Sequence, residues 1–333
     1  MRRIGVALSL AVVSLAVTAT SGASGKGGSL SVVVYSTPKT VYGKIIQAFQ
    51  QTPEGKGVSF TQSYGASTDQ AKAVAAGLGA DLVFLSTGLD VELLVDAGLV
   101  DPKWDRQSYH GIEANTLVVF AVRPGNPKHI KGWADLVRPG VQVVTPNPFS
   151  SGSAKWNILA AYGAERRLGK TDKQAVAYVQ KLFQHVVSQD TSGRNATNTF
   201  LSGKGDVLLT YESEALTSRA AGTDIQYVIP RQTMLIELPI AVLKNSKSKE
   251  LANAFIRFTK GDVAQELFAQ HGWRPVNPKI AKKYASKYPA RPGIFKIGDK
   301  LFGGWRAADK KWFDLKSGIM VGIERSVGGP AGS

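Results

Sequence analysis

The sequence predicts an α/β protein of two Rossmann-like lobes, each with a mostly parallel central sheet, joined by a hinge and holding a ligand in the cleft between them. Short β-rich runs alternate with helical patterns from residue 29 onward, which is typical of parallel sheets with helical crossovers. A second alternating series begins near residue 116, after the first is complete. The chain has 333 residues, 43% of them hydrophobic and 20% charged, which is enough to bury the cores of two lobes.

Residues 1–25 are expected to be a signal peptide. The chain starts with Met1-Arg2-Arg3, continues through an apolar run over 4–17, and then becomes small and polar. The apolar run is shorter than the roughly 20 residues that a membrane-spanning helix needs. We therefore expect an exported protein, in the periplasm or in the extracellular or cell-wall space.

The first lobe is expected to contain three strands, each followed by a helix. The strands lie at 30–35, 58–64 and 81–85, and the helices at 41–50, 68–76 and 91–97. The second series has strands at 116–122, 141–145, 186–189, 207–211 and 225–229, with helices at 154–168 and 173–185.

The rest of the chain has an apolar run at 234–243, helical patterns at 248–258 and 263–270, and a tail without β-α alternation. We assign it to the first lobe, which then comprises residues 29–114 plus 234–333. The second lobe comprises residues 115–233. The chain is expected to cross between the lobes near residues 113–115 and again near 233–235.

The composition excludes several kinds of chemistry. The chain has no cysteine, so disulfides, thiol catalysis and a lipid-modified cysteine are excluded. The four histidines are scattered without metal-ligand spacing, so we expect neither a metal nor a cofactor. A formal charge of +16 attracts anions, but no basic stripe is interleaved with aromatic residues, so we expect no nucleic acid partner.

Five of the expected strand ends lead into segments rich in hydroxyl groups and glycine. Ligands collect at the carboxyl ends of strands in open α/β sheets. A single such segment is most simply an N-cap, but three in one lobe and two in the other favour a shared anion site. They are residues 35–38, 63–68, 147–153, 190–195 and 211–213. Helix N-termini bind sulfate or phosphate through backbone N–H groups and a partial positive charge.

At these segments the sequence resembles the sulfate- and thiosulfate-binding proteins of ABC importers, which belong to the two-lobed periplasmic-binding superfamily (type II). The resemblance runs from about residue 30 to residue 312. Its most specific stretches are Gly125-Asn126-Pro127-Lys128, Thr145-Pro146-Asn147-Pro148, Ser150-Ser151-Gly152, Trp156-Asn157, Thr197-Asn198-Thr199-Phe200, Gly205-Asp206-Val207, Glu212, Glu214-Ala215, Arg274-Pro275 and Phe302-Gly303-Gly304-Trp305.

The resemblance implies a ligand-binding set drawn from both lobes. Its members are Thr37, Ser67, Ser151, Gly152, Ser153, Gly193 and Tyr211. Thr37 stands where relatives commonly carry Asp, and Tyr211 stands where sulfate binders often place a tryptophan. Arg194 is expected to balance charge behind the loop without touching the ligand. The implied protein is a monomer that captures sulfate or thiosulfate, delivers it to ABC permease subunits and performs no catalysis.

Sulfate at neutral pH carries no proton, so its site should contain donors only, whereas hydrogen phosphate needs an acceptor carboxylate. The set contains no carboxylate, but Asp69, Asp190 and Glu212 are close in sequence. A binding protein for phosphate, molybdate or tungstate is therefore the nearest alternative.

Two alternatives come from other classes. Ser36 and Lys39 match the Ser-x-x-Lys pattern of penicillin-recognising acyl enzymes, but the companion elements of that pattern are missing. The charge alone suggests a binder of nucleic acid or cell wall, whose affinity would fall steeply with salt.

Overall fold

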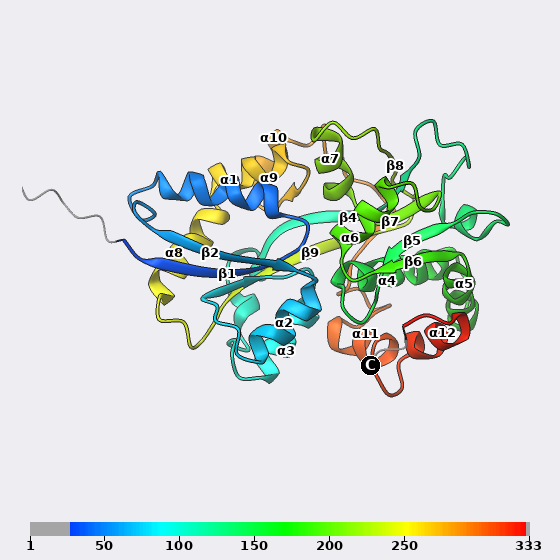
Figure 1. The fold of residues 1–333 in the computed structure, drawn as a ribbon, viewed down its shortest axis with the longest axis horizontal. Coiled ribbons are helices and arrows are strands. Elements are labelled where there is room, and N and C mark those ends of the chain that lie inside the picture. Colours follow the sequence, from blue (N-terminus) through cyan, green and yellow to red (C-terminus); the bar gives the residue numbers. More distant parts are fainter. Residues whose placement is uncertain (1–26, 331–333) are drawn as a thin grey trace, which may run out of the picture.

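A computed structural model describes residues 27–330 (Figure 1). It confirms the predicted α/β class, with helices flanking an open central sheet. The expected signal peptide lies outside the described residues. Within residues 27–330, no helix is long and apolar enough to cross a membrane.

The N-terminal half follows the predicted order of three strands and three helices, and we call it the first lobe. Its elements are β1 (Ser29–Tyr35), α1 (Lys39–Gln50), β2 (Ser59–Gly65), α2 (Ser67–Ala75), β3 (Leu82–Phe84) and α3 (Gly88–Asp96). The strands β2, β1 and β3 are parallel neighbours in that order. In α1, the buried residues Val41, Ile45 and Phe49 recur every four positions, so one face of the helix packs on the sheet.

A second half is built on another set of parallel strands, and we call it the second lobe. Its elements are η3 (Trp133–Val137), β5 (Val143–Pro146), α4 (Gly152–Arg167), α5 (Asp172–Gln184), β6 (Val186–Asp190), α6 (Gly193–Leu201), β7 (Val207–Tyr211), α7 (Glu212–Ala220) and β8 (Gln226–Val228). β5 pairs in parallel with both β6 and β7.

Two long antiparallel strands join the lobes. Two short 3-10 helices, η1 (Trp104–Arg106) and η2 (Ser108–Gly111), lead into β4 (Ile112–Val122), which pairs with β9 (Thr233–Val242). β4 then continues against β7, and β9 against β3, so one sheet runs through both lobes in the order β2-β1-β3-β9-β4-β7-β5-β6. The chain therefore passes between the lobes within the paired strands β4 and β9. From the sequence we expected only short connecting segments at these two places.

The tail contains elements that the sequence pattern did not predict. After α8 (Lys249–Thr259) and α9 (Asp262–Gln270) come β10 (Arg274–Pro275), α10 (Pro278–Lys283), β11 (Ile294–Phe295), α11 (Trp305–Trp312) and α12 (Ile319–Val327). We expected the whole tail to complete the first lobe, but its contacts reach both: α11 packs on α3 and α12 on α5. The division into lobes at the stated residues stays a prediction.

Candidate anion-binding site

The loops that the sequence singled out meet between the two lobes. A Cβ atom placed on Gly193, at the start of α6, would lie 3.3 Å from Oγ of Ser153 and 3.5 Å from Cγ2 of Thr37. One placed on Gly152, at the start of α4, would lie only 2.7 Å from Oγ of Ser86. Thr37 and Ser86 belong to the first lobe, so members of the predicted set from both lobes are brought together.

Tyr211 connects the second lobe to the first. Its Oη lies 2.5 Å from Oγ of Ser86, and both side chains are about 1% exposed. Burial raises the pKa of the Tyr211 phenol well above its usual range, while hydrogen bonds with Ser86 and Ser153 work against that shift. The phenol therefore keeps its proton at neutral pH and is available as a donor.

Three helices direct their N-termini into this region. α2 begins at Ser67, α4 at Gly152 and α6 at Gly193. Ser151 precedes α4 as its N-cap residue, but its side chain makes no capping hydrogen bond, although it is only 2% exposed. Its hydroxyl and the first N–H groups of α4 are thus available to a ligand, and the partial positive charge of each helix end favours an anion.

The side chain of Ser67 is engaged within its own lobe. Its hydroxyl donates to Oδ2 of Asp90 at 2.6 Å and accepts from the backbone N–H of Ser86 at 2.8 Å. The side chain therefore fixes the loop after β3 within the first lobe. What Ser67 can offer an anion in this arrangement is its backbone N–H at the start of α2.

Thr37 has an unusual environment for a hydroxyl. The residue is 2% exposed, and its Oγ1 makes no hydrogen bond of normal geometry among residues 27–330, although it lies near enough to the Tyr35 phenol to oppose the rise in that group's pKa. A buried hydroxyl without a partner costs free energy, which a bound oxyanion would recover by accepting its proton. We therefore suggest that the Thr37 hydroxyl is an additional donor to a bound anion.

Thr37→Val tests this suggestion, because valine keeps the shape of threonine and removes its hydroxyl. A hydrogen bond to a charged group contributes roughly 1.5–3 kcal/mol, so we expect anion affinity to fall about 10- to 150-fold. The unfolding temperature should stay the same or rise, because the unpartnered hydroxyl is gone. Calorimetric titration and thermal unfolding measure the two quantities.

Ser213→Ala is the matched control for that experiment. It removes another buried hydroxyl that has no partner among the described residues, at a position outside the predicted set. Equal affinity losses in both variants would show that the Thr37 hydroxyl has no special relation to the ligand.

Arg194 follows Gly193 at the start of α6 and contacts both lobes. Its Nη2 donates to the backbone carbonyl of Thr37 at 3.1 Å, and its Nη1 lies 3.0 Å from Oε1 of Glu214. Burial raises the pKa of Glu214 to about 7, and the charge of Arg194 opposes that shift. Arg194 therefore links the two lobes and balances a buried carboxylate.

Two of the three nearby carboxylates are engaged elsewhere. Glu212 forms a paired contact with Arg274, at 2.7 and 3.1 Å. Asp190 accepts from the hydroxyls of Thr199 and Ser188 within its own lobe. Burial raises the pKa of the third, Asp69, against the opposing charges of Lys72 and Lys155.

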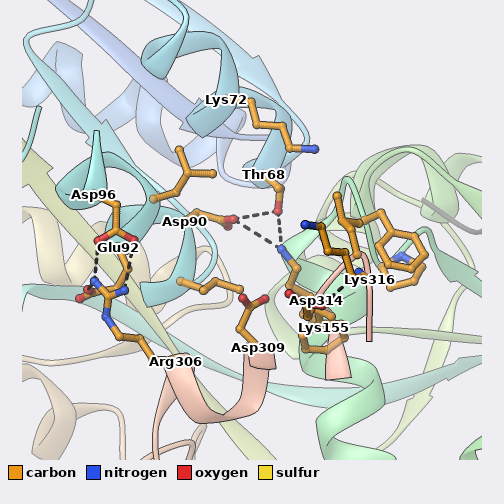
Figure 2. A pocket seen from close by; sticks show the side chains of 16 residues that line it. Thr68, Lys72, Asp90, Glu92, Asp96, Lys155, Arg306, Asp309, Asp314 and Lys316 are labelled. Atoms are coloured by element: carbon orange, nitrogen blue, oxygen red, sulfur yellow. Dashed lines mark hydrogen bonds and ion pairs between the residues drawn. The ribbon is translucent and has the colours of Figure 1, made fainter. Parts of the chain in front are cut away.

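A buried ionic contact that sequence reasoning missed also joins the lobes (Figure 2). Nζ of Lys155, in α4, donates to Oγ1 of Thr68 at 2.8 Å and lies 3.7 Å from Oδ1 of Asp90. Asp90 in turn accepts from Thr68, Ser67 and Thr87. Lys155 lies inside a predicted helix and belongs to no recognisable motif. Its role in joining the lobes is therefore visible only in the structure, where it is buried against the first lobe.

Backbone contacts confirm that the lobes are closed on one another. The N–H of Thr68 donates to the carbonyl of Ser150 at 3.1 Å, and Nε1 of Trp156 donates to the carbonyl of Ser86 at 2.7 Å. Beside them lies a cavity of about 600 Å³, bounded also by α11 and the residues that follow it (Figure 2). No residue of the predicted set lines this cavity, so it is separate from the candidate site.

The acyl-enzyme alternative finds no support in this geometry. Oγ of Ser36 accepts from the backbone N–H of Arg194, at 3.5 Å, while Nζ of Lys39 lies over the ring of Tyr64. No Ser36–Lys39 hydrogen bond occurs among the described residues. Nucleophile activation would require such a contact.

Two lobes that bring hydroxyl groups and helix N-termini together between them are typical of a binding protein for a small anionic solute. The comparison with known families agrees, since residues 30–274 match the family described as bacterial extracellular solute-binding protein. The chain belongs to this family. Solved structures that share less than 25% identity with it, such as the periplasmic binding protein P5PA at a TM-score of 0.64, show the same fold.

Similar proteins in the family carry more specific names. The sulfate-binding protein of Escherichia coli is 37% identical over 82% of this chain and 85% of its own length. The thiosulfate-binding protein of Pseudomonas aeruginosa is 35% identical over 89% of this chain and 92% of its own. Among solved structures, the sulfate-binding protein SubI of Mycobacterium tuberculosis has 44% identity and a TM-score of 0.83, covering 86% of this chain and 99% of that one.

Proposed function

We propose that this protein captures sulfate, or its close relative thiosulfate, between its two lobes and delivers it to the membrane subunits of an ABC importer. The observation that carries the proposal is the meeting of uncharged donors from both lobes, with Thr37, Ser86 and Ser153 all beside the starts of α4 and α6. The names of the similar proteins support the same ligand class.

The lack of an available acceptor favours sulfate over phosphate. None of the seven residues of the predicted set carries a carboxylate, and Glu212 and Asp190 are held by other partners, which leaves Asp69 as the one nearby carboxylate without an engaged partner among the described residues. Hydrogen phosphate brings a proton that a hydroxyl oxygen of the site would have to accept in place of a carboxylate, which is the weaker hydrogen bond in a buried site. The site therefore suits an anion that accepts hydrogen bonds on every oxygen.

The rest of the proposal concerns the protein's place in the cell. We infer that it acts outside the cytoplasm, forms no covalent intermediate, and works as a monomer with permease subunits as partners. Binding would close the lobes, and closure would present the loaded form to the permease. Variants of the site should therefore lose affinity for the anion, and no catalytic rate should be measurable in any of them.

Calorimetric titration of the ligand-stripped protein, without residues 1–26, with sulfate, thiosulfate, phosphate and molybdate tests the proposal. We expect one-to-one binding of sulfate or thiosulfate at micromolar concentrations or below, which corresponds to about −8 kcal/mol or stronger. Phosphate should bind at least about 100-fold more weakly. Raising the salt concentration should change the affinity little, because the ligand is enclosed. Tight binding of phosphate, or no binding of sulfate and thiosulfate, would refute the assignment.

A further inference from the structure

Ser86 makes two hydrogen bonds across the cleft, although the sequence did not single it out. It lies two residues after the end of β3 and is about 1% exposed. Its carbonyl accepts from Nε1 of Trp156, and its Oγ lies 2.5 Å from Oη of Tyr211. Both partners belong to the second lobe, so these two contacts depend on closure.

The position of Ser86 is fixed from its own side of the cleft. Its backbone N–H donates to Oγ of Ser67, and that hydroxyl donates to the buried carboxylate of Asp90. These hydrogen bonds hold Ser86 in place within the first lobe. Its hydroxyl faces the second lobe when the lobes meet.

The hydroxyls of Ser86 and Tyr211 each have one proton. The hydrogen bond between them uses one of these protons, so the other can be donated to a ligand. A hydroxyl can donate one hydrogen bond and accept two. The phenol is the more acidic of the two groups, so beside an anion it is the better donor. Burial keeps the phenol protonated, and Ser153 at the start of α4 lies next to it.

We propose that Ser86 is a positioning residue for the anion: its hydroxyl donates to the oxygen of Tyr211, which leaves the phenol proton directed at the ligand. This inference rests on the proposed function and goes further, because it names how the tyrosine at position 211 becomes a donor. It also makes the pair a determinant of specificity. The phenol is held in place from the opposite lobe, so its distance to the anion is fixed.

The consequence concerns the choice between sulfate and thiosulfate. A phenol held at a fixed distance suits an oxygen acceptor, whereas the terminal sulfur atom of thiosulfate, when it occupies this position, is larger and accepts hydrogen bonds weakly. Releasing the phenol should therefore cost sulfate more affinity than thiosulfate. The ratio of the two dissociation constants is the sensitive quantity.

A double-mutant cycle of Ser86→Ala and Tyr211→Phe tests the proposal. Each single variant should raise the dissociation constant for sulfate about tenfold and the constant for thiosulfate less. The double variant should be no weaker than the weaker single variant within about threefold, because the two hydroxyls act as one unit. The control is Ser202→Ala, whose hydroxyl donates within the exposed end of α6, and it should bind as the unchanged protein does.

The outcomes separate this inference from the proposed function. If the unchanged protein binds neither sulfate nor thiosulfate, both fail. If it binds and Ser86→Ala changes the sulfate constant less than twofold, only the role of Ser86 fails. Losses that multiply in the double variant, near a hundredfold, would show that the hydroxyls act independently and would also overturn it. Thermal unfolding without ligand should change little in Ser86→Ala, because the Tyr211 phenol that loses its partner can reach water when the lobes separate.

Discussion

Gly152→Ala is expected to weaken anion binding strongly while leaving the protein folded. A Cβ atom at this position would lie 2.7 Å from Oγ of Ser86 and 2.8 Å from Cγ2 of Thr87, both across the cleft. Overpacking of this kind typically costs 1–3 kcal/mol, which corresponds to roughly a 5- to 150-fold loss of affinity. The variant keeps the backbone N–H of residue 152 as a donor. A loss of affinity would therefore report on how well the lobes can close.

The clash exists only when the lobes meet, and this makes the prediction selective. In an open form the new methyl group faces the cleft, and alanine is at least as good as glycine in a helix. Thermal unfolding without ligand should therefore be unchanged or slightly improved. Calorimetric titration with sulfate measures the affinity on the same samples.

Two further glycine variants calibrate this experiment. Gly43→Ala, in α1, places a methyl group where no atom lies within 4 Å, so it should leave affinity unchanged. Gly193→Ala meets Ser153 at 3.3 Å, a contact that small movements relieve, so its loss should be smaller. Normal binding by Gly152→Ala would mean that the ligand-bound lobes are farther apart at this point than the structure shows.

The sequence predicts this candidate site because its chemistry follows local rules. Strand ends with hydroxyl groups and glycine mark helix N-termini, and helix N-termini bind anions whatever the rest of the chain does. Thr37, Gly193 and Tyr211 could be placed on this basis together with the family resemblance. Their meeting in space then follows from the position of strand ends in an open sheet.

The parts that the sequence did not predict depend on contacts between distant segments. Ser67 lies in the expected loop, yet its hydroxyl is used by Asp90, which is 23 residues away. Ser86 and Tyr211 are 125 residues apart and meet only because the lobes close. The tail helices α11 and α12 are short and do not alternate with strands. The sequence pattern therefore could not predict that they pack on α3 and α5.

Lys155→Met is expected to reduce anion affinity at least about tenfold without unfolding the protein. Lys155 is 4% exposed and belongs to the second lobe, while its partners Thr68 and Asp90 belong to the first. Removing one member of a buried ion pair leaves the other charge uncompensated, which typically costs 3–5 kcal/mol. Water can reach Asp90 when the lobes separate, so the cost falls on the closed form, and calorimetric titration detects it as lost affinity.

The charge of Asp90 provides the decisive comparison. Asp90→Asn in the Lys155→Met background removes the uncompensated charge, so it should restore part of the lost affinity, although the amide serves the hydroxyls of Ser67, Thr68 and Thr87 less well. Lys170→Met, at an exposed position after α4, controls for the loss of one positive charge and should have little effect at physiological salt. If Lys155→Met lowers the unfolding temperature without ligand and leaves affinity intact, the lysine stabilises the fold. If affinity falls while the unfolding temperature holds, the ion pair stabilises closure, and the free energy of binding then includes a contact that never touches the anion.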